Sequence, residues 1–267
     1  MSAAAAATPV SHVAAPATYP SLAGRRVVIT GGGSGIGAAM VEAFARQGAE
    51  VVFLDIAERA SLALESSLAT APGIAIAPRY RHCDLLDLAA LAAVFAQIGA
   101  VDVLVNNAAN DDRHQIADVS PAYWDNRMNV NLRHQYFCAQ AVVPAMQAAG
   151  RGVILNLGSI SWHLALPNLS LYMMAKAAIE GMTRGLARDL GPSGIRVNSV
   201  IPGAVRTPRQ TELWHTPDEE VKILAGQCLP QRVEPEDVAA LVLFLASDNA
   251  ARCTGRDYFV DAGWIGG

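Results

Sequence analysis

Short apolar runs alternate with longer segments of helical spacing along most of the chain. The apolar runs are rich in β-branched and aromatic residues, which favour buried strands; they cover residues 26–30, 50–55, 80–83, 101–105, 153–157, 195–201 and 258–260. Segments with helical periodicity lie between and after them, at 38–47, 61–68, 85–97, 121–149, 172–188, 218–225 and 235–247. Strands that alternate with helices form parallel sheets covered on both faces. We therefore predict an α/β fold with a doubly wound, seven-stranded parallel sheet in a single domain.

The chain has 267 residues, which suits one domain of this class. Its first twenty residues contain no Lys, Arg, Asp or Glu and include Pro9, Pro16 and Pro20, so they lack the basic start of a secretory signal. We expect a disordered leader at 1–20, a folded domain at 21–267 and a substrate lid around 204–226. No apolar run reaches the roughly 18 residues of a membrane helix, so no membrane partner is expected.

Composition narrows the function classes further. The formal net charge is −4, whereas nucleic-acid-binding domains usually carry a basic face, so no nucleic-acid partner is expected. The four cysteines and six histidines are scattered without the spacing of metal ligands, so no metal site is predicted. Reduced thiols are typical of a cytoplasmic protein, and this is the location we expect.

A glycine-rich turn stands between the first predicted strand and the first predicted helix. It reads TGGGSGIG over residues 30–37. This placement is typical of Rossmann-type dinucleotide sites, because glycines let the backbone approach a pyrophosphate and the helix N-terminus offers free N–H groups. We therefore predict cofactor contacts at Gly31, Gly33, Ser34 and Ile36.

Asp55 ends the second predicted strand, 18 residues after Gly37. A carboxylate there can accept hydrogen bonds from the adenosine ribose and repels a 2′-phosphate, which favours NAD over NADP. Ser34, which is not basic, points the same way. An Asp that only caps a helix is the alternative interpretation, and Arg46 and Arg59 leave NADP possible.

Other polar residues also fall where predicted strands end. Asp84 follows the third strand and Asn107 follows the fourth. Ligands of doubly wound sheets bind beyond the carboxyl ends of the strands, so we expect these side chains near the cofactor.

The predicted helix at 121–149 contains residues that disfavour a regular helix. Pro144 should kink it or begin a new turn. Asn129 and Asn131 are intrinsically poor helix formers. One of the two is expected to mark a kink or a water-binding site.

The strongest candidates for chemistry lie between residues 159 and 176. Tyr172 and Lys176 are four residues apart in a predicted helix and therefore share a face. An ammonium at ~4–6 Å lowers the pKa of a phenol and makes it a usable base near neutral pH. Ser159 follows a predicted strand and could hold the substrate oxygen. The alternative is a packed tyrosine beside a solvated lysine.

These motifs together resemble the short-chain dehydrogenase/reductase family from about residue 22 to residue 264, with NNAA at 106–109, VNL at 130–132, YMMAK at 172–176 and PGAVRT at 202–207. The resemblance implies that Tyr172 is the general acid/base and that Lys176 lowers its pKa and binds the nicotinamide ribose. It also implies that Ser159 orients the reacting oxygen and that Asn131 holds a water linked to Lys176. The implied cofactor contacts are Gly31, Gly33, Ser34, Ile36, Asp55, Asp84, Leu85, Asn107, Tyr172, Lys176, Val205 and Thr207. Ala109 departs from the family's usual glycine.

A narrower resemblance rests on NDDRH at 110–114, VNLRH at 130–134, GSISWHL at 158–164 and DAGW at 261–264. These segments are similar to those of bacterial NAD-dependent D-xylose 1-dehydrogenases and related aldose dehydrogenases. The resemblance implies oxidation of C1 of a cyclic aldose, such as D-xylose or L-arabinose, to the aldonolactone by a homotetramer. The candidate sugar contacts are Asn110, Ser159, Ser161, His163, Asn168, Tyr172, Arg209 and Trp214. Several of these residues could instead be solvated loop residues.

Three other functions stay open at this point. The substrate could be another aldose, such as L-fucose or D-galactose. The enzyme could be a 3-oxoacyl or ketone reductase of the same fold, which a strong preference for NADPH would favour. A non-catalytic nucleotide sensor is the third, although the chain keeps all of Asn131, Ser159, Tyr172 and Lys176.

Overall fold

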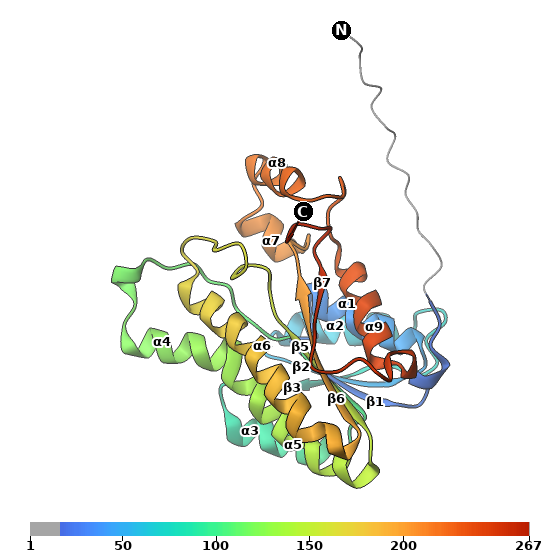
Figure 1. The fold of residues 1–267 in the computed structure, drawn as a ribbon. Helices are drawn as coiled ribbons and strands as arrows, with labels where there is room; N and C mark the ends of the chain where they lie inside the picture. Colours follow the sequence, from blue (N-terminus) through green and yellow to red (C-terminus); the bar gives the residue numbers. More distant parts are fainter. Residues whose placement is uncertain (1–16, 267) are drawn as a thin grey trace.

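A computed structural model describes residues 17–266 as one sheet with helices on both faces (Figure 1). Seven parallel strands are arranged in the order β3-β2-β1-β4-β5-β6-β7. The strands are β1 (Arg26–Thr30), β2 (Glu50–Asp55), β3 (Arg79–His82), β4 (Val103–Asn106), β5 (Gly152–Leu157), β6 (Ile195–Pro202) and β7 (Asp257–Val260). The predicted doubly wound, seven-stranded Rossmann-type sheet is confirmed.

The strand order reverses at β1, which pairs with β2 on one side and with β4 on the other. In such sheets the crevice for a ligand opens beyond the carboxyl ends of the strands at this reversal. The register places Ile29 beside both Phe53 and Val105. Thr30, Asp55 and Asn107 therefore come together at the same edge of the sheet.

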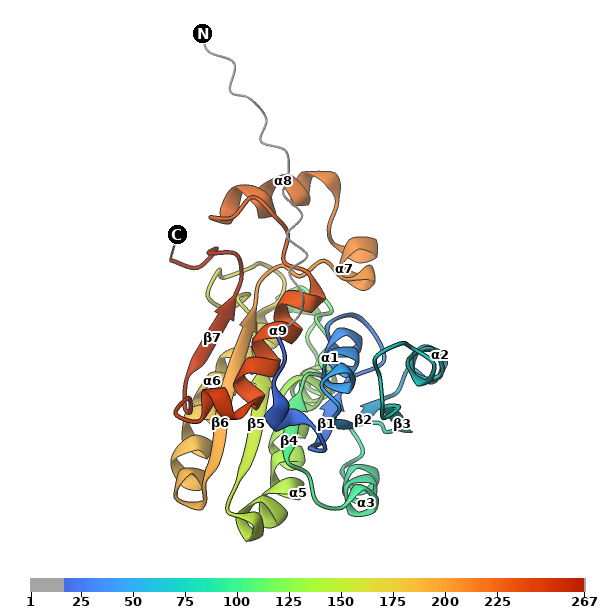
Figure 2. The same cartoon turned by 90° about the vertical axis from the view of Figure 1, so that its right-hand side faces the viewer.

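Nine α-helices connect or cover the strands: α1 (Gly35–Arg46), α2 (Glu58–Ala69), α3 (Leu88–Ile98), α4 (Pro121–Met128), α5 (His134–Ala149), α6 (Ser170–Leu190), α7 (Pro208–Leu213), α8 (Pro217–Gly226) and α9 (Pro235–Ala246), counted over residues 17–266. Helices α1, α2 and α9 pack on one face, and α3, α5 and α6 pack on the other, as Figures 1 and 2 show together.

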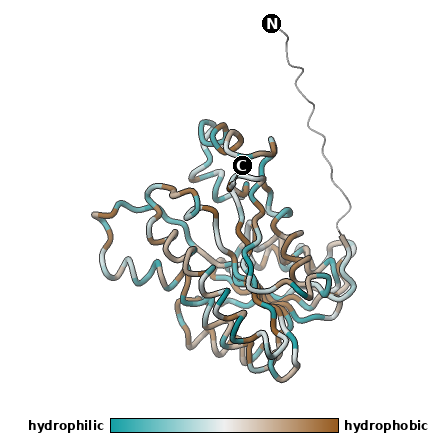
Figure 3. Tube along the Cα trace, in the orientation of Figure 1, coloured by the Kyte–Doolittle hydropathy of each residue, from teal (hydrophilic) through white to brown (hydrophobic). Residues whose placement is uncertain are grey.

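The two faces have separate apolar cores because successive strand residues point to opposite sides of a sheet. Val27 and Ile29 belong to the core under α1 and α9, whereas Val28 belongs to the core under α3, α5 and α6. Each fully buried aliphatic side chain contributes about 1.5–3 kcal/mol relative to exposure. The hydrophobic stretches of the trace lie mainly in the central strands (Figure 3). Of the helices that the structure describes, none is both long and apolar enough to span a membrane.

The predicted helix at 121–149 is interrupted at one of the two places that the sequence suggested, the two asparagines, and not at Pro144. It divides into α4, a π-helical turn (Asn129–Arg133) and α5. Pro144 lies within α5, which continues to Ala149. The irregular turn thus coincides with the two asparagines, where we expected a kink or a water site.

Two further expectations change. Residues 204–217, where the sequence showed no helical spacing, contain α7, which Thr207 caps by accepting a hydrogen bond from the Gln210 N–H. At the N-terminal end, the Tyr19 N–H donates to Gln47, the residue that caps the end of α1, and a 3₁₀ turn begins at Pro20. The predicted leader of 1–20 is therefore too long at its end, and residues 1–16 lie outside the described residues.

The turn between β1 and α1 is packed so closely that side chains are excluded from it. Gly31 has φ +65°, a region that L-residues rarely adopt. A Cβ at Gly37 would lie 1.9 Å from the Gly31 carbonyl oxygen. These glycines are therefore fixed by the close approach of backbone to backbone at the start of α1.

Gly37→Ala should destabilise the protein, because either the turn or α1 must move to admit the methyl group. Overpacking of this kind costs about 1–3 kcal/mol or more. Gly185→Ala is the matched control: its Cβ would meet nothing within 4 Å, so this substitution in α6 should stabilise by about 0.5–1 kcal/mol. Thermal unfolding of both variants measures the difference. Equal midpoints for the two would contradict this account of the turn.

Candidate active site

The glycine turn and Asp55 form one hydrogen-bonded unit at the end of β2. The Gly33 N–H donates to Asp55 Oδ2 over 2.8 Å, and the Ala57 N–H donates to Oδ1 over 2.8 Å. The carboxylate is thus fixed beside the turn, as the sequence predicted. It does not cap α2, whose N-cap is Ala57. Ser34, the exposed N-cap of α1, makes no side-chain cap bond.

Asn107 joins the fourth strand to the same turn. Its side-chain amide donates to the carbonyl oxygens of Thr30 (3.0 Å) and Gly31 (2.9 Å). The Thr30 hydroxyl oxygen in turn accepts from the N–H groups of Asn107 and Ala108. Asn107 therefore shapes the cofactor crevice, and its amide N–H groups are used within the chain.

The remaining predicted cofactor residues differ in how far their side chains are buried. Leu85 and Val205 are buried in the apolar cores, so only their backbones can face a ligand. Asp84 is exposed and Ile36 half-buried. Thr207 lies against the glycine turn, because its Cγ2 would be 3.3 Å from a Cβ at Gly35. The N-cap residue of α7 thus lies against the N-terminal end of α1.

The catalytic candidates meet where β5 ends and α6 begins. Lys176 is only 1% exposed, and its Nζ donates to the Leu157 carbonyl oxygen over 2.6 Å. The same Nζ lies 5.4 Å from the centre of the Tyr172 ring. The Ser159 hydroxyl is close enough to the Tyr172 phenol to lower its pKa. The structure therefore brings Ser159, Tyr172 and Lys176 together.

Their electrostatics differ from the prediction. Burial lowers the pKa of Lys176 to about 7, and the Asp111 carboxylate opposes this shift. Burial raises the pKa of Tyr172, Asp111 raises it further, and the Ser159 hydroxyl lowers it. In the protein chain by itself the net shift of the Tyr172 pKa is therefore upward and is caused mainly by burial. The lowering of this pKa by Lys176 stays a prediction.

The Asn131 side chain makes hydrogen bonds within the protein, and the water expected at this residue stays a prediction. Its Oδ1 accepts from the Asn110 N–H (2.8 Å), and its Nδ2 donates to the carbonyl oxygens of Asn110 (3.0 Å) and Arg127 (3.0 Å). The side chain is fully buried and holds the loop that follows β4. A water at Asn131 would have to use its backbone.

His134 is a site residue that the sequence reasoning missed. It is fully buried, with Nε2 3.1 Å from the Ala108 carbonyl oxygen. Burial lowers the pKa of His134 to about 4, and the nearby Lys176 lowers it too. A neutral imidazole therefore lies behind the lysine. Its place in VNLRH, one turn after Asn131, was the available signal.

Three of the sugar candidates lie in the loop before α6, and two of them are used within the protein. His163 Nε2 is 3.0 Å from Glu180 Oε1, and its ring stacks on Trp162 at 3.8 Å. Asn168 has φ 61° and its Oδ1 accepts from Gln115. The structure thus assigns both of them bracing contacts. Ser161 is buried, and its Oγ has no hydrogen-bond partner within residues 17–266.

The other candidates belong to a contact between the β4 loop and the lid, which we call the lid clasp. It joins Asp111, Asp112 and Arg113 to Arg209, Gln210 and Trp214. Gln210 Nε2 donates to Asp111 over 2.6 Å, and Arg209 pairs with Asp112 over 2.8 Å. The Arg113 guanidinium lies 4.7 Å from the centre of the Trp214 ring. Sequence reasoning missed the two aspartates, although the consecutive acids in NDDRH were a signal.

The clasp closes α7 over the carboxyl end of the sheet, where Figures 1 and 2 show α7 and α8 standing above the strands. Asn110 lies at its base, held by Asn131. In the part of the chain that the structure describes, no three His, Cys, Asp or Glu side chains gather as metal ligands would.

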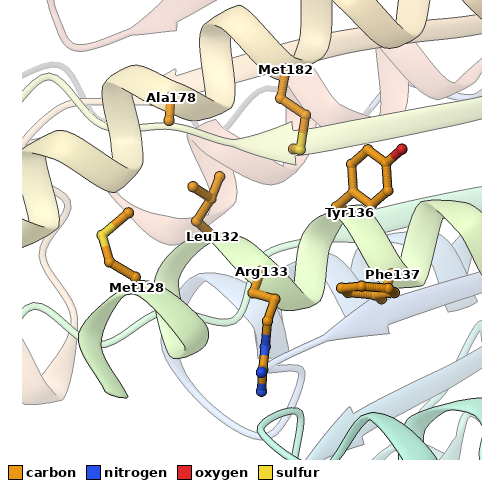
Figure 4. Close-up of a pocket in the computed structure, with 7 residues that line it drawn as sticks. All are labelled: Met128, Leu132, Arg133, Tyr136, Phe137, Ala178 and Met182. Carbon is orange, nitrogen blue, oxygen red and sulfur yellow. The ribbon is translucent and has the colours of Figure 1, made fainter. Parts of the chain in front are cut away.

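A separate groove of about 480 Å³ lies away from these residues, between the π turn, α5 and α6 (Figure 4). It is lined by Met128, Leu132, Arg133, Tyr136, Phe137, Ala178 and Met182. Apart from Arg133 the lining is apolar or aromatic. Tyr136 remains 48% exposed.

Comparisons with known proteins agree with this geometry. A family model described as enoyl-(acyl carrier protein) reductase matches residues 31–265. The D-xylose 1-dehydrogenase of Caulobacter vibrioides is 64% identical over 248 residues, which cover 93% of this chain and 98% of that protein. A probable galactose dehydrogenase of Rhizobium meliloti is 46% identical, with 92% of this chain and 96% of that protein covered.

Solved structures show the same fold. A short chain dehydrogenase/reductase family protein superposes with a TM-score of 0.81 at 36% identity, covering 91% of this chain and 98% of its own. A gluconate 5-dehydrogenase from Burkholderia cenocepacia, in complex with NADP and tartrate, superposes with a TM-score of 0.85 at 29% identity, covering 93% and 98%.

Proposed function

The chain belongs to the short-chain dehydrogenase/reductase family, and we propose that it is a sugar 1-dehydrogenase. It oxidises C1 of a cyclic aldose, a pentose such as D-xylose or L-arabinose, to the aldonolactone with NAD(P)⁺. The observation that carries this proposal is the site at the start of α6, where Ser159, Tyr172 and Lys176 meet in a chain 64% identical to a D-xylose 1-dehydrogenase.

Each residue of the site has a part in this reaction. Tyr172 takes the proton of the C1 hydroxyl, and the Ser159 hydroxyl, whose bond lowers the phenol pKa, orients that oxygen. Lys176, held by the Leu157 carbonyl oxygen, stabilises the Tyr172 phenolate when the lysine carries its positive charge. Asn131 fixes the loop at Asn110 that bounds the sugar site. Fixed geometry of this kind supplies much of an enzyme's rate enhancement.

The residues at the crevice fit a nicotinamide dinucleotide. The turn at Gly31 and Gly37 leaves no room for a Cβ, as a backbone cradle for a pyrophosphate requires, and the first N–H groups of α1 have no side-chain cap. When bound, NAD(P)⁺ supplies the hydride acceptor and a positively charged ring. Asp55 beside Gly33 favours NAD through the adenosine ribose.

The other candidates have weaker support. The galactose relative, 46% identical, keeps D-galactose and L-fucose as substrates to be tested. A ketone or 3-oxoacyl substrate stays the second class, although the matching family model is described for an enoyl reductase. The cytoplasmic location expected from the sequence stays a prediction.

The wild-type protein should reduce NAD⁺ with D-xylose or L-arabinose faster than with L-fucose or D-galactose. Tyr172→Phe removes the base but not the ring, so turnover should fall at least a thousandfold while NADH binding, followed by fluorescence, stays within a factor of a few. Absorbance at 340 nm measures turnover. Silence of the wild type across all four sugars would refute the proposed function, and an active Tyr172→Phe variant would remove the tyrosine from the base role.

Asp55→Ala should weaken NAD⁺ more than NADP⁺. The variant loses the acceptor for the ribose hydroxyls together with the repulsion of a 2′-phosphate. The kcat/KM for NAD⁺ divided by that for NADP⁺ should therefore fall about tenfold or more. Glu58→Ala, a carboxylate in the first turn of α2, is the control and should leave the ratio unchanged. An equal loss for both cofactors would contradict the role of Asp55.

We further propose a homotetramer in which the groove between α5 and α6 is covered by a second copy of the chain. The support is the apolar lining of that groove and the exposed Tyr136 and Met174 on the same helices. Charged residues make up only 16% of the chain, which suits buried subunit surfaces.

Ala178→Arg places a charged side chain in the groove and should therefore split the assembly into smaller species. Light scattering coupled to size exclusion measures the mass of wild type and variant. Ala63→Arg on α2, at an exposed alanine outside the groove, is the control. An unchanged mass for Ala178→Arg would show that the groove is not a subunit interface.

A further inference from the structure

Within residues 17–266, Asp111 is the carboxylate whose charge acts on both Tyr172 and Lys176. It stands in the loop after β4, whose two ends are fixed at the site. Asn110 is held by Asn131 through its N–H and its carbonyl oxygen. His114 is held by the Asn168 carbonyl oxygen and contacts Ser170 Oγ, two residues before Tyr172. The backbone of Asp111 therefore crosses the mouth of the catalytic site.

The lid clasp contains two carboxylates, Asp111 and Asp112, and basic side chains neutralise the charge of Asp111 less than that of Asp112. Asp112 has two close guanidinium partners, Arg127 at 3.0 Å and Arg209 at 2.8 Å. Asp111 has the neutral amide of Gln210 at 2.6 Å on Oδ2, and Arg209 only at 3.4–3.5 Å on Oδ1. A carboxylate offers about four acceptor positions. Oδ1 thus keeps capacity for a further donor.

We propose that Asp111 positions and selects the sugar: its carboxylate, fixed by the lid, accepts a hydrogen bond from a ring hydroxyl of a neutral aldose and repels sugars that carry a negative charge. This inference rests on the proposed function and names the substrate class of the same site. Gln210 and Arg209 belong to α7, so contacts with the lid hold this carboxylate in place.

The groups that face Asp111 fix the sign of its effect on pH dependence. Tyr172 and Lys176 face Asp111 from α6, and Arg209 faces it from α7. Asp112 is its neighbour in the loop and pairs with Arg127 of α4. The buried His134 of α5 faces Lys176. A carboxylate disfavours loss of a proton from a neighbouring phenol or ammonium, and Asp111 raises the pKa of both Tyr172 and Lys176. Removing its charge therefore lowers the pKa of the base.

The test compares Asp111→Asn with Asp112→Asn, at saturating NAD⁺ and with D-xylose. In Asp111→Asn the acid limb of kcat/KM should move to lower pH by roughly 1 unit, and KM for D-xylose should rise about tenfold through loss of a charge-assisted hydrogen bond. Because Asp112→Asn also removes a lid ion pair, the comparison uses its acid limb and not its rate, and this acid limb should coincide with that of the wild type. Asp111→Glu keeps the charge, so most of the shift should be absent in this variant.

Selection against charge has its own readout. D-Glucuronate and D-glucose share the xylopyranose ring and differ in a carboxylate against a hydroxymethyl group. As inhibitors competing with D-xylose, D-glucuronate should bind more weakly than D-glucose in the wild type. The inhibition constant of D-glucuronate divided by that of D-glucose should fall at least fivefold in Asp111→Asn but not in Asp112→Asn. Asp111→Ser is a second neutral variant, to be used if Asp111→Asn does not fold.

The outcomes separate this inference from the proposed function. An active wild type with an unshifted acid limb and an unchanged inhibitor ratio in the neutral Asp111 variants would overturn the inference alone. Equal shifts in Asp111→Asn and Asp112→Asn would also overturn it, because the effect would then belong to the lid clasp as a whole. A wild type inactive with every aldose would overturn the proposed function and this inference together.

Discussion

The site depends on a lysine ammonium held inside the protein by a backbone carbonyl. Lys176 is almost fully buried, and its Nζ donates to the Leu157 carbonyl oxygen at the end of β5. Burial of an ammonium is costly, which is why its pKa falls to about 7. The sheet provides the carbonyl and α6 provides the lysine, so the catalytic geometry is a product of how β5 and α6 pack. Any element that moves α6 along β5 alters the charge that Tyr172 experiences.

A second constraint joins the rest of the site to this pair. Asn131 ties the π turn to the loop at Asn110, and that loop carries Asp111 to the lid. Thr207 at the start of α7 also touches the glycine turn at Gly35. The cofactor crevice, the catalytic helix and the lid are therefore linked by short contacts between neighbouring segments, and none of the three is positioned independently of the other two.

The sequence predicted the sheet well, because buried strands and glycine turns are local signals. Strand number, strand direction and the place of Asp55 at the end of the second strand all follow from such signals. The hydrogen bonds of the lid clasp were not predictable, because they join residues of the β4 loop to residues of α7 that are about 97–99 positions away in the sequence. The spacing of Tyr172 and Lys176 was correct, but their electrostatics depended on burial, which spacing alone does not reveal. His163 was read as a sugar ligand, whereas it pairs with Glu180, a partner 17 residues away whose burial only the fold determines.

Because of the π turn at Asn129–Arg133, the geometry of the site depends on the number of residues in this segment. Such a turn contains one residue more than an α-helical turn, and the side-chain amide of Asn131 bonds the Arg127 carbonyl oxygen within it. Loss of a single residue here would restore a regular helix, and Asn131 would no longer stand in the irregular turn from which it holds Asn110. Insertions and deletions in this stretch are therefore less tolerable than many substitutions, although the segment lies far from the glycine turn in the sequence.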